Sequence, residues 1–341
     1  MTAAFEASPW HEGERAMQAR AGVRERMEVI GTRVIRDHMP DQHRDFFARL
    51  PFLIVGGLDQ ASQPWASVLA APPGFAHSPD PRHLRIDVLP ADGDPLAQAL
   101  RPGASIGLLG IEPHTRRRNR MNGTVERVDG GGFAVEVRQS FGNCPKYIQA
   151  REPVFVNGER AAAMPRRVAH IDAAARRVIE AADTFFIASS HPAAGSAGVA
   201  QGVDVSHRGG RPGFARVAAD GSLTVPDFVG NSFFNTLGNI AVNPRAGLLF
   251  VDFDSGDLLQ LAVTAEVIWD GPELAAFEGA ERLLRMRVVS VLHRPAALPL
   301  RWGGAALSPY LDATGHWPAA APEGVSVFQW KTGMRALTDG R

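Results

Sequence analysis

Short apolar runs separated by turn residues recur along the whole chain, and they predict a protein built mainly from β-strands. In the first half the runs are FLIVG (52–56), WASVLA (65–70), LRIDV (84–88), SIGLLGI (105–111) and NGTVERV (122–128). In the second half they are FFIAS (185–189), GVDVS (202–206), GFARV (213–217), SLTV (222–225), AGLLFVDF (246–253) and LLQLAVTAEVIW (258–269). Gly, Pro and Asp residues separate these runs, which favours an antiparallel barrel over a parallel α/β sheet.

Helical patterns occupy the same relative places in both halves. A helical segment precedes the strands at residues 13–39 and again at 170–182. A second, shorter helix is expected in the middle of each half, at residues 95–100 and 233–242. The predicted class is therefore α+β, mainly β, with short flanking helices.

An internal repeat explains this parallel. GLLGIE (107–112) returns as GLLFVD (247–252), and TVE (124–126) returns as TAE (264–266), both after 140 residues. PPGF returns as RPGF after 139 residues. Matches in the same order at a nearly constant offset indicate a duplicated domain. We place the boundary near residue 165, which gives domains of residues 1–165 and 166–341.

Charge and composition exclude several classes of function. The chain has 341 residues, with 36 basic and 36 acidic side chains, so its net charge does not attract nucleic acid or an anionic membrane. Lysine occurs only at Lys146 and Lys331, so a phosphate site must rely mainly on arginine. The sequence shows no signal peptide and no apolar run of the roughly 20 residues that span a bilayer, which predicts a cytoplasmic protein.

Familiar catalytic and metal-binding motifs are missing or misplaced. The only cysteine is Cys144, and the eleven histidines lack compact ligand spacing, so neither a disulfide within the chain nor a metal site is expected. GASIG (103–107) resembles a nucleophile elbow, but an apolar strand rather than a helix follows it. The chain contains no GxGxxG and no P-loop motif.

The stretch VDVSHRGGRPGFARV (203–217) is the first candidate site. A strand pattern stops to display Ser206, His207 and Arg208 beside two glycines. A hydroxyl and a guanidinium next to flexible backbone can hold an anion such as a cofactor phosphate. The alternative is an exposed hairpin corner.

Two further stretches supply polar groups. Asn231 and Asn235 stand near the start of the helix predicted at 233–242, where free N–H groups favour an anion, although both could simply cap the helix. Arg116, Arg118 and Arg120 would share one face of a strand, either around an anion or as a solvated rim. The nearby Cys144 could be a reactive thiol or an ordinary buried residue.

The second half resembles the pyridoxamine 5′-phosphate oxidase-related FMN-binding split-barrel flavoproteins. The segments VDVSHRGGRPGFARV, LTVPDFVGN and NIAVNPRAGLLFVDF carry this resemblance. In the first half, SQPWAS, PPGF, TRRRNRMNG and NCPKYI are similar to stretches of two-copy members.

The resemblance implies two tandem six-stranded antiparallel Greek-key split barrels with one FMN between them. FMN is then the expected cofactor, ahead of FAD and haem. The expected cofactor-binding residues are Ser206, His207, Arg208, Asn231, Asn235 and Thr236, joined from the first half by Arg116, Arg118 and Arg120.

The sequence also departs from the family pattern. Many members carry Arg or Lys where this chain has Ser232 and Phe233. The chain therefore lacks cations that would bind a phosphate at these positions. The arginines of the first half would compensate if the two halves face one another. Substrate residues of the vitamin B6 enzyme are not recognisable, so its own reaction is not expected.

Three functions follow as hypotheses. The first is an FMN-dependent oxidoreductase acting on a small-molecule substrate. The second is a non-catalytic module that binds flavin or haem, and the third is a subunit that works with a ferredoxin-reductase-type electron-transfer partner. No nucleic-acid or membrane partner is expected, and the sequence leaves open whether two chains pair as a homodimer.

Overall fold

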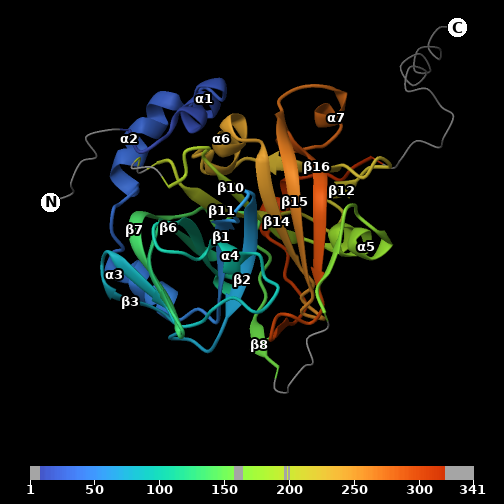
Figure 1. The fold of residues 1–341 in the computed structure, drawn as a ribbon. Helices are drawn as coiled ribbons and strands as arrows, with labels where there is room; N and C mark the ends of the chain where they lie inside the picture. Colours follow the sequence, from blue (N-terminus) through green and yellow to red (C-terminus); the bar gives the residue numbers. More distant parts are fainter. Residues whose placement is uncertain (1–7, 157–163, 196–197, 199, 319–341) are drawn as a thin grey trace, which may run out of the picture.

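A computed structural model describes residues 8–156, 164–195, 198 and 200–318. Strands predominate, and they gather in two antiparallel sheets that lie against one another (Figure 1). A short two-stranded sheet, β8 (Pro153–Phe155) with β17 (Leu300–Trp302), ties the end of the first half to the end of the second. The predicted mainly β class is confirmed.

The first sheet contains seven strands in the order β2-β1-β5-β6-β7-β4-β3. Their bounds are β1 Phe52–Leu58, β2 Pro64–Ala70, β3 Ala76–Asp80, β4 His83–Ile86, β5 Ser105–Glu112, β6 Arg117–Asp129 and β7 Gly132–Gly142. The second sheet has eight strands, with the main order β11-β10-β14-β15-β16-β13-β12 and with β9 paired to β16. Their bounds are β9 Arg166–Val168, β10 Thr184–Ser190, β11 Val203–Gly209, β12 Arg216–Val217, β13 Leu223–Phe228, β14 Arg245–Val251, β15 Leu258–Ile268 and β16 Ala280–Arg294.

The two sheets share one topology. If β10 to β16 are numbered as a second set of seven, both sheets run 2-1-5-6-7-4-3. The registers agree as well, because Ser67 of β2 pairs with Val55 and Ser206 of β11 pairs with Ile187 on the matching neighbour strand. This agreement is what a duplicated sequence would produce.

The expectation of six-stranded barrels is corrected by the strand pairing. Each sheet is an open path that ends at β2 and β3, or at β11 and β12, and the described residues form no closed barrel. The hairpin of β3 and β4 joins its sheet through β7, and the hairpin of β12 and β13 joins its sheet through β16, which gives seven strands in each path. β7 and β16 were not among the predicted strands.

The helices cover the ends of the sheets. They are α1 Glu12–Arg20, α2 Arg24–Val34, α3 Asp41–Ala48, α4 Leu96–Ala99, α5 Ala173–Ala181, α6 Asn235–Val242 and α7 Pro272–Ala275, with short 3₁₀ helices at Pro113–Thr115 and Pro309–Ala313. The single helix predicted at 13–39 is wrong. It breaks into α1 and α2 at Gly22, whose positive φ of 69° is a conformation that suits glycine.

Three apolar clusters hold the architecture together. One cluster packs against the first sheet and a second packs against the second sheet. The third lies between the sheets and joins Phe52, Ile54 and Leu109 to Phe186, Val205 and Leu249. Burial of this third cluster favours a fixed arrangement of the sheets, since apolar area removed from water stabilises at roughly 25 cal/mol per Å².

Two glycines allow the sheets to touch through their backbones. A Cβ on Gly107 of β5 would lie 2.5 Å from the Val203 carbonyl oxygen of β11. A Cβ on Gly247 of β14 would lie 2.2 Å from the Pro64 carbonyl oxygen of β2. The two contacts are equivalent under the repeat, so the sheets are related by an approximate two-fold arrangement.

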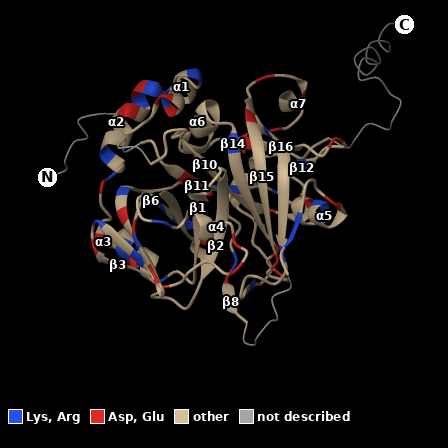
Figure 2. Cartoon of the chain, in the orientation of Figure 1, with Lys and Arg blue, Asp and Glu red and all other residues tan. Residues whose placement is uncertain are grey.

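Charged side chains of both signs are interspersed over the elements, as Figure 2 shows for α1 and α2. Among the described residues, no helix combines the length and the apolar character needed to cross a lipid bilayer.

Candidate functional site

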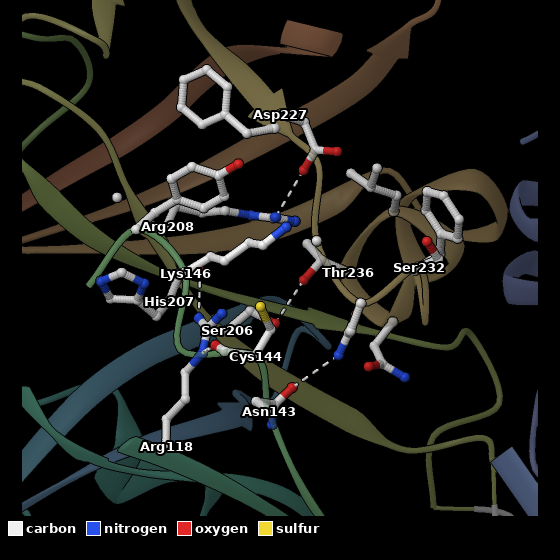
Figure 3. Close-up of a pocket in the computed structure, with 18 of the residues that line it drawn as sticks. Arg118, Asn143, Cys144, Lys146, Ser206, His207, Arg208, Asp227, Ser232 and Thr236 are labelled. Carbon is white, nitrogen blue, oxygen red and sulfur yellow. Dashed lines mark hydrogen bonds and ion pairs between the residues drawn. The ribbon is translucent and has the colours of Figure 1, made fainter. Parts of the chain in front are cut away.

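A polar pocket lies where the two halves meet. Its volume is about 110 Å³. The first half contributes β6 and the segment after β7, and the second half contributes β11, β13, α6 and the start of β16. The charged and polar lining residues are Arg118, Arg120, Asn143, Cys144, Lys146, Tyr147, Ser206, Arg208, Asp227, Asn231, Ser232, Asn235, Thr236, Glu281 and Arg282. Figure 3 shows that side chains of both halves converge there.

Strand β11 presents its side chains alternately. Ser206 and Arg208 share the face toward the pocket, as does Asp204. His207 also borders the pocket, but its ring lies edge-on to Phe186 with centroids 5.8 Å apart. Burial, and then nearby arginines, hold the pKa of His207 well below its usual range, so the ring is neutral at pH 7. Its main-chain oxygen accepts a bond from Arg118 at 3.4 Å.

Arg120 links the two halves beneath the pocket. Its Nη1 donates to Asp204 Oδ1 at 2.7 Å, and its Nη2 donates to the hydroxyl of Ser206. Asn122 and Asn239 each donate to the same carboxylate at 2.8 Å. Burial lowers the pKa of Arg120, while Asp204 raises it. Asp204 is thus the counter-charge of Arg120.

Arg118 has a different environment. Its Nε donates to the Cys144 carbonyl oxygen at 2.7 Å, and it has no carboxylate partner in the part of the chain that the structure describes. Burial lowers the pKa of Arg118 to about 10, so the guanidinium is still charged at neutral pH. Arg118 is half-buried, and a partly desolvated cation without a counter-charge favours the binding of an anion.

Lys146 is the second cation without a carboxylate partner among the described residues. Its ammonium group lies 5.2 Å from the ring centroid of Tyr310. Tyr147, beside it, packs on Phe228 with ring centroids 5.1 Å apart and donates from its hydroxyl to the Val229 carbonyl oxygen at 3.2 Å. Burial raises the pKa of Tyr147 to about 12, so this hydroxyl keeps its proton.

The other cations are neutralised within the pocket. Asp227 accepts from Arg208 Nη1 at 2.8 Å and from Arg282 Nε at 2.9 Å. Arg282 also pairs with Glu281. Five cations therefore face three carboxylates, counting Asp204, and Arg118 and Lys146 supply the excess positive charge.

The loop before α6 forms one wall. Ser232 and Phe234 both have φ of 62°, and no side chain caps the helix. Asn231 Oδ1 accepts from the Phe233 N–H at 3.1 Å, and its Nδ2 donates to Asn143 Oδ1 at 3.4 Å. Thr236 donates to Ser206 at 2.9 Å.

Asn235 lines the pocket, and its side chain is held by a contact with the N-terminal helix. Its side-chain amide donates to Glu14 at 2.5 Å. Phe233 packs against Trp10 and Phe141 with ring centroids 5.0 and 5.7 Å away.

Arg116 is not brought into the pocket, contrary to the prediction. β6 begins at Arg117, and Arg116 precedes it in the left-handed region with φ of 54°. Its guanidinium donates to the carbonyl oxygens of Ile148, Ala306 and Leu307. The alternation of the strand therefore starts one residue later than expected, and it directs only Arg118 and Arg120 to the pocket.

Several lining residues were not predicted as site residues. Lys146, Asp227 and Arg282 line the pocket, and Asp204 stands behind it. The rarity of lysine was a signal for Lys146. Arg282 had no signal, because its strand β16 was not predicted.

His11, Glu12 and His191 place possible metal-ligand atoms within 4.8 Å of one another, behind α6. Their hydrogen bonds argue against a metal site. Nδ1 of His11 accepts from the Gly13 N–H, and Nδ1 of His191 accepts from the Ala193 N–H. In a neutral imidazole the other nitrogen then carries the proton, so neither Nε2 offers a lone pair. The hydrogen bonds of these three residues instead stabilise the start of α1.

Comparison with known proteins gives little beyond these observations. No protein-family model and no curated protein matches the chain. A variant of HupZ from Group A Streptococcus, solved at 1.98 Å, is 13% identical over 36% of this chain and 98% of its own, with a TM-score of 0.29. A 1.70 Å HupZ structure is 15% identical over 35% of this chain and 89% of its own, with a TM-score of 0.27. The K. pneumonia MrkH–c-di-GMP complex is 11% identical over 75% of this chain and 83% of its own, with a TM-score of 0.21. TM-scores of this size establish neither fold nor ligand, so the function has to be argued from the pocket.

Proposed function

We propose that the pocket binds FMN and that the protein is an FMN-dependent oxidoreductase whose two halves, residues 1–165 and 166–341, are duplicated domains that share one site. The observation that supports this most directly is the excess positive charge of Arg118 and Lys146 in a pocket made by both halves. A phosphate monoester carries about −1.5 to −2 charge at pH 7, which matches two cations.

The other lining groups suit a phosphate as well. Ser206 accepts bonds from Arg120 and Thr236, so its own proton is available to an anion. Asn143 Nδ2 is shielded from solvent and has no partner among the described residues. The uncapped start of α6 adds main-chain N–H groups.

A flat ring system would find apolar surface beside these groups. Tyr147 and Phe228 line the pocket and pack on one another. A bound flavin would supply the hydride or electron chemistry. The residues of this chain would hold its phosphate, orient its ring and limit access of water.

FMN is favoured over haem because the one histidine among the described lining residues, His207, turns its ring toward Phe186. The reduction of a small-molecule substrate and an electron supply from a ferredoxin-reductase-type partner belong to the same proposal. A non-catalytic flavin carrier would share the pocket and lack the turnover.

The test is a titration of the purified protein with FMN, riboflavin and haemin, in which binding is monitored by flavin fluorescence and by the visible spectrum. We expect FMN to bind with the phosphate adding affinity over riboflavin. Lys146→Ala should weaken FMN and leave riboflavin nearly unchanged. Arg127→Ala is the control, because this exposed arginine of β6 pairs with Asp129 away from the pocket.

A Soret band with haemin and no response to FMN would contradict the proposal. Binding of FMN that Lys146→Ala does not change would place the flavin elsewhere. If FMN binds but neither NADH nor a ferredoxin-type donor reduces it faster than free FMN, the carrier function is the better description.

A further inference from the structure

The repeat gives the pocket a counterpart on the other side of the interface. Arg120 of β6 reaches across to Ser206 of β11, as described above. By the same geometry, Gln260 of β15 reaches across to Ser67 of β2, with its Nε2 2.8 Å from the hydroxyl oxygen. The registers establish the equivalence, since Leu109 pairs with Arg120 and Leu249 pairs with Gln260.

The counterpart already contains an anion of the protein itself. The buried carboxylate of Asp94 accepts a bond from the hydroxyl of Ser67, from the Leu96 N–H at 2.9 Å and from Arg294 Nη1 at 2.6 Å. Asp94 and Arg294 are each 4% exposed. A hydroxyl, a main-chain N–H at the start of a short helix and a guanidinium together satisfy this carboxylate.

The pocket has neutral residues at the matching positions. Asn231 takes the place of Asp94, because its Oδ1 accepts the Phe233 N–H as Asp94 accepts the Leu96 N–H. Asn143 takes the place of Arg294, one strand position beyond the last pair of β6 and β7. The ion pair of the counterpart thus becomes the Asn143–Asn231 hydrogen bond.

The cations follow the opposite pattern. Arg118 and Arg208 of the pocket correspond to Leu258 and Leu69, which are buried in the apolar clusters. Ser206 keeps a proton to donate, whereas Ser67 gives its proton to Asp94. The pocket contains cations and lacks a carboxylate at this position, whereas the buried counterpart contains the carboxylate and lacks these cations.

We propose that Asp94 is a built-in anion that occupies and closes the second copy of the site, and that Asn231 keeps the first copy open for an external anionic group. The chain then binds one phosphate-bearing ligand, with its anion near the Ser206 hydroxyl and Asn231. The identity of that ligand as FMN rests on the proposed function, but the anion subsite does not.

The decisive variant is Asn231→Asp, which gives the pocket the carboxylate of its counterpart. We expect FMN and inorganic phosphate to bind roughly tenfold to a hundredfold more weakly, the range of a lost charge-assisted hydrogen bond. Riboflavin, which has no phosphate, should be nearly unaffected. The readouts are equilibrium dialysis for stoichiometry and thermal stabilisation by added phosphate.

Asp94→Asn is the matched control. It makes the reciprocal exchange, and we expect it to lower the unfolding temperature while FMN affinity at the pocket stays within about twofold. Asn143→Asp is the second variant if Asn231→Asp does not fold, because it places a carboxylate against the same subsite and should cause the same loss.

The outcomes separate the two proposals. One FMN per chain, with a loss in Asn231→Asp, supports both. Binding of two FMN per chain, or equal FMN affinity of Asn231→Asp and the wild type, overturns the proposal that Asp94 closes the second copy. Either result leaves the FMN proposal unaffected. If the wild-type protein binds phosphate but not FMN, and Asn231→Asp abolishes phosphate binding, the anion subsite is supported and the FMN proposal is overturned. A wild-type protein that binds neither phosphate nor FMN overturns both.

Discussion

Arg120 and Asp204 form a buried ion pair that joins the first sheet to the second, with Nη1 and Oδ1 2.7 Å apart. Both side chains lie under the pocket rather than in its opening. The pair fixes Ser206, which accepts from the same guanidinium. The position of the pocket hydroxyl therefore depends on a contact between the two halves.

Arg120→Met is expected to lower the free energy of unfolding by about 3–5 kcal/mol, because Asp204 would keep a buried charge without its partner. Adding Asp204→Asn should recover part of this loss by removing that charge. Urea unfolding followed by far-UV circular dichroism measures both variants. A loss below about 1 kcal/mol, typical of exposed pairs, would show that solvent reaches Asp204.

Arg208→Ala is expected to weaken FMN about tenfold to a hundredfold, since a hydrogen bond to a charged group contributes about 1.5–3 kcal/mol. Arg208 shares Asp227 with Arg282, so the carboxylate keeps one partner and the fold should persist. Fluorescence titration beside Arg127→Ala measures the change. If Arg208→Ala and Arg127→Ala bind FMN equally well, Arg208 pairs with Asp227 and does not contact the ligand.

Gly247→Ala is expected to separate the sheets, because its Cβ would lie 2.2 Å from a main-chain oxygen of β2. We expect a clear fall in unfolding temperature and weaker ligand binding, since the pocket needs both halves. Gly142→Ala is the control, as its Cβ would have no neighbour closer than 3.7 Å. Similar unfolding temperatures for the two variants would contradict the close backbone contact.

His43 should make the protein sensitive to acid. Burial, and then Arg36 and Arg117, lower the pKa of His43 to about 4, and its Nδ1 lies 2.9 Å from the Ser140 hydroxyl oxygen. The unfolded chain takes up this proton near pH 6.5, so it binds more protons than the folded chain between about pH 6.5 and 4. The free energy of unfolding should therefore fall as the pH drops through this range.

His43→Gln isolates this contribution from that of the carboxylates. The slope of unfolding free energy against pH between 6.5 and 4 should flatten by up to about 1.4 kcal/mol per pH unit. Urea unfolding at several pH values gives the slope for both proteins. Parallel slopes would show that His43 is protonated in the folded state.

Features that depend on the local residue pattern, such as strand content and the internal repeat, could be predicted from the sequence. The repeat at 139–140 residues and the turn residues between apolar runs predicted two mainly β units of similar topology, and the strand orders of the two sheets agree. The prediction that each unit closes into a barrel was wrong. The pattern could not predict β7 and β16. It also placed Arg116 with Arg118, because a strand that begins one residue later cannot be distinguished by alternation alone.

The pocket was predictable only in part. Ser206 and Arg208 could be selected because a strand displayed them beside glycines. The contact of Asn235 with Glu14 could not, since 221 residues separate the two. Neither could the pairing of Asp227 with Arg282, which requires the partner strand of β13 to be known.

The presence of both copies in one chain has a consequence for how the sites can change. In an assembly of two identical chains, a substitution that closes one site also closes the other. Here position 94 can carry aspartate while position 231 carries asparagine. Because both copies lie in one chain, the two positions can be substituted independently. One copy can then stabilise the fold through the buried Asp94–Arg294 ion pair, while the pocket of the other copy can specialise for a ligand.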